Sequence, residues 1–189
     1  MIRIGILGNI GSGKSYIANN FGYPVFNADK AVAELYRKDK KVFYKLNKNL
    51  PQFFTKFPID KNEIIKAILS NKKNLKKITN VVHKEIKKKI KLFVKKNKNK
   101  KIVILDIPLL LENKLNNKSD VLIFVEAKAS DIEKKLKKRL NFNRKLYNKF
   151  KKIQFSEFYK KKKSNFIIKN NFMKKNVKIK IKNILKKIS

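Results

Sequence analysis

Short apolar runs alternate along the chain with longer stretches in which apolar residues recur at helical spacing. Residues 2–7, 101–106 and 120–125 form nearly continuous apolar runs, which are typical of strands buried on both faces of a parallel sheet. Two shorter runs, residues 23–26 and 165–168, predict two further strands. Because strands that alternate with helices form parallel sheets, the pattern predicts an α/β fold with a parallel five-stranded sheet and helices on both faces.

The stretches between these runs predict the helices. A helix is expected directly after the first strand, over residues 14–21. Asn27 or Asp29 is the expected N-cap of the next helix, and Ser130 with Glu133 has the pattern of a capping box. The other predicted helices cover most of residues 39–100, with a break before a new helix that opens at residue 60, then residues 132–140, residues 154–163 and the basic C-terminal stretch.

The loop between the first strand and the first helix reads GNIGSGKS and fits the pattern G-x-x-x-x-G-K-[ST]. Glycines let successive backbone N–H groups point into one concavity, and the helix N-terminus adds its dipole to that anion site. A lysine at the end of such a loop reaches the β- and γ-phosphates, and the following hydroxyl ligates Mg²⁺. We therefore expect ATP, with Mg²⁺ on Ser15, at a site formed by Gly8, Asn9, Ile10, Gly11, Ser12, Gly13, Lys14, Ser15 and Tyr16.

Composition adds a strong positive charge to this picture. The 189 residues include 51 Lys and Arg and 13 Asp and Glu, so the formal net charge is +38. Such a charge is typical of nucleic-acid-binding proteins, but Arg, which contacts bases and phosphates in a bidentate way, occurs only four times. Lys and Asn are abundant while Gly and Pro are scarce, so compositional drift is the favoured explanation. No dedicated nucleic-acid partner is expected.

Three absences narrow the class of protein further. No apolar run approaches the length that spans a bilayer. The N-terminus lacks the apolar region and cleavage site of a signal peptide. The chain has no Cys, so neither a disulfide nor a thiolate metal site is possible. We expect a cytoplasmic protein without a membrane partner, and a monomer or weak oligomer.

Several segments along nearly the whole chain resemble those of the dephospho-coenzyme A kinase family, whose members are P-loop kinases similar to the nucleoside monophosphate kinases. ILGNIGSGKS looks like the family's opening strand and loop, and VILDIPLLLEN looks like its most distinctive segment. FNADK and VVHKEI resemble the family's Asp-Ala-Asp and Leu-His-Pro sites. Residues 154–170 have the family's spacing from a Gln beside the lid to the Val-Ile-x-Asn ending.

The resemblance implies a fold and a reaction. The reaction is ATP-dependent phosphorylation of the ribose 3′-hydroxyl of dephospho-coenzyme A, which gives coenzyme A as the last step of its biosynthesis. The fold is a single P-loop kinase domain with three parts. By resemblance, these are a core over residues 1–38, 101–138 and 154–189, a helical acceptor-binding region over residues 39–100 and a lid over residues 139–153.

The resemblance also gives roles to individual residues. Asp29 follows the second predicted strand, at the carboxyl edge of the sheet, and matches the family's acidic residue that acts on the acceptor hydroxyl as a base or orienter. Arg139 matches the family's lid arginine and is expected to bridge the transferring phosphates, so Lys14, Asp29 and Arg139 are the predicted catalytic residues. Arg144 and Asn170 are expected to contact ATP. The residues expected to contact the acceptor are Asp29, His83, Asp106, Pro108, Leu109, Leu110 and Glu112.

Five sites depart from the family pattern, one of them being Ser164-Asn165, which replaces the usual Ala-Asp before the last strand. Asn9 replaces a glycine of the loop, Asn27 replaces the first Asp of Asp-Ala-Asp, Lys84 replaces the Pro after His83, and Phe150 stands where many relatives have a lid Arg. Two alternative functions therefore stay open. One is another small-molecule P-loop kinase, of the nucleoside or nucleotide type. The other is a basic nucleic-acid-binding protein with a vestigial P-loop.

Overall fold

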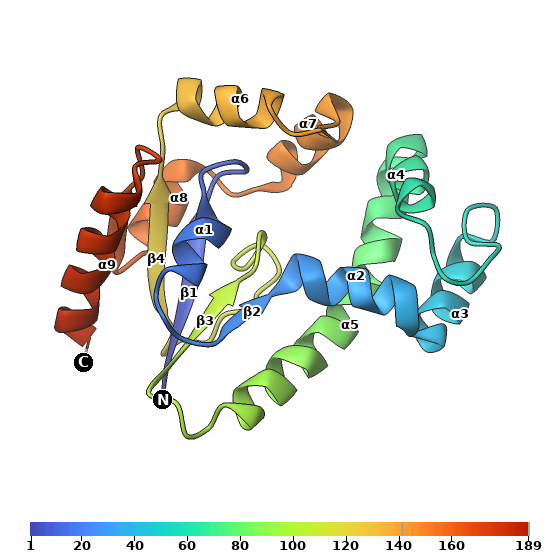
Figure 1. Cartoon of the computed structure of the whole chain (residues 1–189). Coiled ribbons are helices and arrows are strands. Elements are labelled where there is room, and N and C mark those ends of the chain that lie inside the picture. The colour runs from blue at the N-terminus through green and yellow to red at the C-terminus, as the bar shows by residue number, and fades with distance from the viewer. Residues whose placement is uncertain (141, 189) are drawn as a thin grey trace. The chain divides into compact units, whose positions relative to one another are not determined.

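The computed structural model describes residues 1–140 and 142–188 of the chain (Figure 1). The chain divides into two compact units. One consists of Met1–Asn27 together with Val94–Ser189, and the other consists of Ala28–Phe93. Each unit is described by itself.

The first unit is built on a parallel sheet that, over the described residues, has five strands. They are β1 (Ile2–Gly8), β2 (Val25–Asn27), β3 (Ile102–Asp106), β4 (Val121–Glu126) and β5 (Phe166–Lys169), in the spatial order β2-β3-β1-β4-β5. Every pair is parallel, with Ile4 beside Ile104 of β3 on one side and Val121 of β4 on the other. The predicted parallel sheet is confirmed, with each of the shorter strands displaced by one or two residues.

Helices cover both faces of this sheet. On one face, α1 (Lys14–Asn19) and α9 (Lys174–Ile188) form a buried apolar cluster with strand residues that include Ile123 and Val125. Phe124 lies between these two residues and therefore points to the opposite face. There the ammonium of Lys161, on α8 (Glu157–Lys162), lies 5.7 Å from the centre of its ring. The predicted helices on both faces are confirmed.

The second unit is helical. It contains α2 (Ala28–Lys38), α3 (Lys40–Asn49), α4 (Lys61–Ser70) and the greater part of α5 (Lys72–Lys96). Asp60 and Glu63 form a capping box on α4, as expected for a helix that opens at residue 60. Apolar residues at helical spacing along α5, from Ile78 through Ile90, supply part of the buried core of the unit.

The starts of α6 and α8 differ from the sequence prediction, whereas α2 begins directly after Asn27, one of its two expected N-caps. The carbonyl of Lys128 accepts hydrogen bonds from the backbone of Asp131 and Ile132, so α6 (Ala129–Lys137) begins before Ser130 and the predicted capping box is wrong. Asp29 lies inside the first turn of α2. The predicted helix over residues 154–163 begins only at Glu157, because the Ser156 hydroxyl caps it. Ahead of it, α7 (Arg144–Ile153) occupies a stretch over which the sequence pattern predicts no helix.

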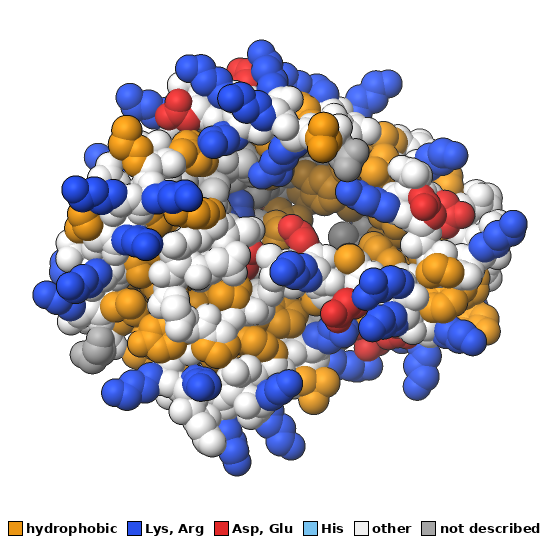
Figure 2. Space-filling model, viewed as in Figure 1, with side chains coloured by type: hydrophobic (Ala, Val, Ile, Leu, Met, Phe, Trp, Pro, Cys, Tyr) orange, Lys and Arg blue, Asp and Glu red, His pale blue; other side chains and the backbone are white. Residues whose placement is uncertain are grey.

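The surface is strongly basic. Figure 2 shows Lys and Arg side chains scattered over the whole visible face, with a few Asp and Glu between them. This distribution fits solvated helix faces more closely than a single basic stripe. Within the described residues, no helix is both long enough and apolar enough to cross a membrane.

Candidate active site

The glycine-rich loop connects β1 to α1 and takes backbone angles that only glycine adopts easily. Gly11 and Gly13 have φ values of 87° and 92°. A Cβ on Gly13 would lie 2.4 Å from Nδ2 of Asn170. Gly13 is therefore required twice, by its left-handed backbone and by the close approach of Asn170.

Lys14 and Ser15 open α1 at the end of this loop. The Lys14 side chain is buried and turns back over the loop, where its Nζ donates hydrogen bonds to the carbonyls of Gly8 at 3.0 Å and Asn9 at 2.9 Å. Ser15 and Tyr16 are exposed in the first turn of the helix. The structure thus brings the lysine and the hydroxyl of the motif to the loop, as the pattern predicts.

Asn170 joins the segment after β5 to the same loop. Its side chain is 3% exposed, its Nδ2 donates to the Ser12 carbonyl at 2.8 Å, and its Oδ1 accepts from the Phe172 backbone at 2.9 Å. Both polar atoms of this side chain therefore have partners within the protein. Its predicted contact with ATP stays a prediction, whereas its contact with the loop backbone is present.

Asn9 ties the loop to the start of α8. Its Nδ2 donates to Oε2 of Glu157, and its Oδ1 accepts from Nζ of Lys160, both at 2.9 Å. Lys160 is 2% exposed, and burial lowers the pKa of its ammonium, opposed by the nearby carboxylates of Glu112 and Glu157. Hydrogen bonds from Lys161 and Asn9 lower the pKa of Glu157. The Asn9 side chain thus makes two contacts with α8.

The segment after β3 lies at the carboxyl edge of the sheet. Asp106 is buried at the end of β3 and accepts a 2.7 Å hydrogen bond from Nδ2 of Asn27, its partner in the register of β2. Oε1 of Glu112 accepts from the backbone of Phe155 at 2.9 Å, and Gln154 donates to the Pro108 carbonyl at 3.5 Å. The PLLLEN segment is therefore held against the chain that leads into α8.

Within this segment, the residues predicted to contact the acceptor differ in exposure. Pro108, Leu109 and Glu112 are half-buried, whereas Leu110 is fully buried. The Leu110 side chain packs so closely over β1 that a Cβ on Gly5 would lie 2.6 Å from it. Leu110 therefore has a core position, and the predicted substrate contacts of these four residues stay predictions.

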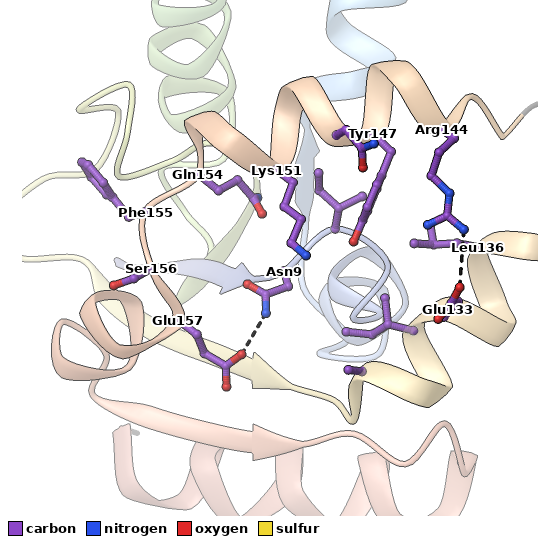
Figure 3. A pocket seen from close by; sticks show the side chains of 14 residues that line it. Asn9, Glu133, Leu136, Arg144, Tyr147, Lys151, Gln154, Phe155, Ser156 and Glu157 are labelled. Carbon is purple, nitrogen blue, oxygen red and sulfur yellow. Dashed lines mark hydrogen bonds and ion pairs between the residues drawn. The ribbon is translucent and has the colours of Figure 1, made fainter.

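A cavity of about 490 Å³ lies beside the loop (Figure 3). It is lined by Asn9 and Ile10 of the loop and by residues of α6, α7 and 154–157. Arg144 lines it and forms an ion pair with Glu133 at 3.4 Å. Arg139 is exposed beyond the end of α6 and does not line it. The structure therefore brings one of the two lid arginines to this cavity.

The chain that contains this loop and sheet matches a known protein family. A family model described as dephospho-CoA kinase matches residues 2–176 of the chain. The chain belongs to the dephospho-CoA kinase family. It is 34% identical to a dephospho-CoA kinase of Wolbachia sp. subsp. Brugia malayi, over 98% of this chain and 97% of that protein. It is 33% identical to one from Rickettsia bellii, over 89% of this chain and 87% of that protein.

Solved structures agree with the fold. TT1252 from Thermus thermophilus is 26% identical with a TM-score of 0.78, over 100% of this chain and 98% of that chain. A dephospho-CoA kinase from Campylobacter jejuni has a TM-score of 0.64 at 22% identity, over 99% of this chain and 97% of that chain. A shikimate kinase from Bacteroides thetaiotaomicron has a TM-score of 0.54 at 11% identity, over 99% of this chain and 98% of that chain. The last two likenesses concern the fold alone.

Asp29 and His83, which the dephospho-CoA kinase resemblance assigned to the acceptor, both belong to the second unit. Asp29 is exposed in the first turn of α2, directly after β2. His83 is half-buried on α5, where burial, and then the charge of Lys87, lowers its pKa below the usual 6.5. Their contacts with the acceptor stay predictions.

The sequence did not predict three charged residues beside the phosphate loop. Glu157 and Lys160 contact Asn9, and Lys151 lines the adjacent cavity. Runs of lysine usually form solvated helix faces, yet Lys160 is among the most buried polar residues of the described chain. The only sequence signal was Asn9 itself, because an amide in a loop of glycines needs hydrogen-bond partners. The identity of those partners, about 150 residues away, was not readable from the local pattern.

Proposed function

We propose that this chain transfers the γ-phosphoryl group of ATP to the ribose 3′-hydroxyl of dephospho-coenzyme A. The observation that carries this proposal is the lysine-bearing glycine loop between β1 and α1, in a chain whose family model spans residues 2–176. The loop binds a triphosphate, and membership of the family indicates which acceptor receives the phosphoryl group. The products are ADP and coenzyme A.

Lys14 and Ser15 hold the phosphates in this proposal. The Lys14 ammonium exchanges its loop carbonyl partners for the β- and γ-phosphates. The exposed Ser15 hydroxyl is an oxygen ligand of the kind Mg²⁺ prefers, and Mg²⁺ in kinases takes few protein ligands beside phosphates and water. Bound Mg²⁺ supplies charge neutralisation on the phosphates.

Asp29 presents the acceptor. A bond forms between the 3′-oxygen and the γ-phosphorus while the bond from that phosphorus to the β,γ-bridging oxygen breaks. The proton of the 3′-hydroxyl passes to the Asp29 carboxylate, and the electron pair of the broken bond leaves with ADP. Asp29 is suited to this role because it stands at the carboxyl edge of the sheet, directly after β2.

Other parts of the chain have supporting roles. We assign acceptor binding to residues 39–100 with His83, and to Asp106 and residues 108–112. Residues 139–153 form the lid, with Arg139 and Arg144 on the phosphates, and Asn170 supports ATP through the loop that it contacts. The protein works in the cytoplasm as a monomer or weak oligomer.

An acceptor panel tests the function. Labelled ATP is offered with dephospho-coenzyme A, with nucleoside monophosphates and with shikimate, and the labelled product is identified. Transfer to the 3′-hydroxyl of dephospho-coenzyme A is expected. Transfer to a nucleoside monophosphate alone would replace the proposal with a nucleotide kinase.

Lys14→Ala tests the phosphate loop in the same assay. Removing the ammonium takes away a positive charge aimed at the transferring phosphoryl group, so kcat/KM is expected to fall by about 100-fold or more. Circular dichroism confirms that the variant is folded. Retention of more than about a tenth of the activity would contradict the role of Lys14.

A further inference from the structure

The cavity beside the phosphate loop is lined by four charged side chains in the described part of the chain. Arg144 and Lys151 are the cations, and Glu133 and Glu157 are the anions. All four lie in the first unit, so their arrangement belongs to one compact body. The availability of each charge to a ligand depends on whether it already has a partner of opposite charge.

Three of the four already have partners of opposite charge. Arg144 pairs with Glu133 at 3.4 Å, and its guanidinium carbon lies 5.4 Å from the centre of the Phe142 ring. Glu157 pairs with Lys161 at 2.8 Å and accepts the hydrogen bond from Asn9. These contacts compensate the negative charges of the two carboxylates that line the cavity. They also occupy the guanidinium group of Arg144.

Lys151 differs from the other three. Over residues 1–140 and 142–188, its ammonium has no hydrogen bond and no ion pair. Figure 3 shows the side chain leaving α7 and pointing toward Asn9 of the loop, whereas Arg144 points toward Glu133 on α6. An uncompensated cation is therefore directed at the loop from across the cavity.

The side chain of Lys14 turns toward the same residue of the loop, Asn9. Nζ of Lys14 donates to the Asn9 carbonyl at 2.9 Å, and the lysine of such a loop reaches the β- and γ-phosphates. Three ammonium groups thus face Asn9, of which Lys14 and the buried Lys160 donate hydrogen bonds to it, while Lys151 points toward it from α7 without a partner of its own in the described residues. Charge that develops on the transferring phosphoryl group is spread over its equatorial oxygens, so a second cation on the open side stabilises it.

We propose that Lys151 is a catalytic residue that binds the terminal phosphate of ATP from the lid side. The family resemblance assigns the bridging of the transferring phosphates to Arg139, which is exposed and does not line the cavity. A lysine suits the position because its ammonium is a compact charge on a flexible stem. The proposal rests on the proposed function only in that ATP binds at the loop, and it does not depend on the acceptor.

Calorimetric titration with two nucleotides tests the proposal. Lys151→Ala is titrated with ADP and with the β,γ-imido analogue of ATP, both with Mg²⁺. Loss of a charge-assisted contact to the γ-phosphate is expected to weaken the analogue by about 10- to 100-fold, with little effect on ADP. Lys152→Ala is the matched control, because Lys152 is an exposed neighbour on α7 that does not line the cavity. It should bind both nucleotides as the wild type does.

Two results would overturn the proposal. In one, Lys151→Ala binds the analogue as tightly as Lys152→Ala does. In the other, ADP and the analogue weaken equally, so the lost contact does not discriminate the γ-phosphate. A Lys151→Arg variant, which keeps the charge, is expected to bind the analogue more tightly than Lys151→Ala does. Failure of dephospho-coenzyme A to accept phosphate would refute the proposed function alone, since these titrations contain no acceptor.

Discussion

The predicted role of Asp29 rests on its match to the family's acidic residue and on its position after β2. It is exposed in the first turn of α2, immediately after β2 at the carboxyl edge of the sheet. Asp29→Asn keeps the shape and removes the base, so turnover is expected to fall by about 100-fold or more, with ATP affinity changed by less than about twofold. Steady-state kinetics with dephospho-coenzyme A and titration with ATP measure the two effects.

Asp39→Asn is the matched control for this prediction. The Asp39 side chain caps α3, and Asn caps helices as well as Asp does, so this variant should keep both activity and stability. Normal turnover by Asp29→Asn would remove Asp29 from the mechanism. An equal loss of turnover in both variants would show that removal of a negative charge, and not the position of Asp29, causes the effect.

His83 predicts a pH dependence of stability. It is the single histidine of the chain, and burial, followed by the charge of Lys87, lowers its pKa in the folded protein. The unfolded chain takes up a proton near pH 6.5, whereas the folded protein takes it up only at lower pH. The folded state therefore loses stability as the pH falls from the unfolded pKa toward the folded pKa.

Urea unfolding of the wild type and of His83→Gln measures this effect. The free energy of unfolding of the wild type is expected to decrease between about pH 7.5 and about pH 5.5, and that of the variant should change less. Equal slopes for the two proteins would show that other groups govern stability in this range.

At the scale of elements, the segment after β5 supports the phosphate loop through Asn170. Its side chain satisfies the Ser12 carbonyl and the Phe172 backbone while it lies against Gly13. Asn170→Ala removes both hydrogen bonds and leaves a buried carbonyl without its donor. The free energy of unfolding is expected to fall by about 2 to 3 kcal/mol, and ATP binding is expected to weaken because the loop loses its support.

Thermal or urea unfolding and ATP titration measure the two consequences. Asn171→Ala is the neighbouring control, because the Asn171 side chain is exposed and only accepts from the Met173 backbone at 3.2 Å. It should lose less than about 1 kcal/mol and keep its ATP affinity. Unchanged ATP affinity in a destabilised Asn170→Ala protein would limit Asn170 to a role in folding.

At the scale of the whole molecule, the net charge of +38 sets the response to salt. Lysines are spread over the visible surface, so the folded state carries much like-charge repulsion (Figure 2). Salt screens such repulsion over a Debye length of about 10 Å at 0.1 M. The melting temperature is therefore expected to rise when NaCl is raised from about 0.05 M to about 0.5 M. Sulfate is avoided because it binds at phosphate loops and stabilises the fold by itself. A constant or falling melting temperature would contradict this prediction.

The sequence alone determined the sheet and the loop. Continuous apolar runs predicted the strands, because a strand buried on both faces has few polar positions. The glycine pattern with Lys14 predicted the phosphate loop, because left-handed backbone angles and a helix N-terminus are local properties. The family resemblance then gave the acceptor. The strands and the loop were predictable because each depends on residues close together in the chain, whereas the resemblance draws on segments along nearly its whole length.

Only the tertiary structure decided which charged side chains surround the loop. Lys160 and Lys151 look alike in a run of lysines, yet one is buried against Asn9 and the other lines the cavity. Arg139, which the family resemblance favoured, is exposed and does not line that cavity. The reason is that burial of a long side chain depends on contacts between distant segments, such as Asn9 with Lys160, 151 positions later. Local periodicity carries no information on such contacts.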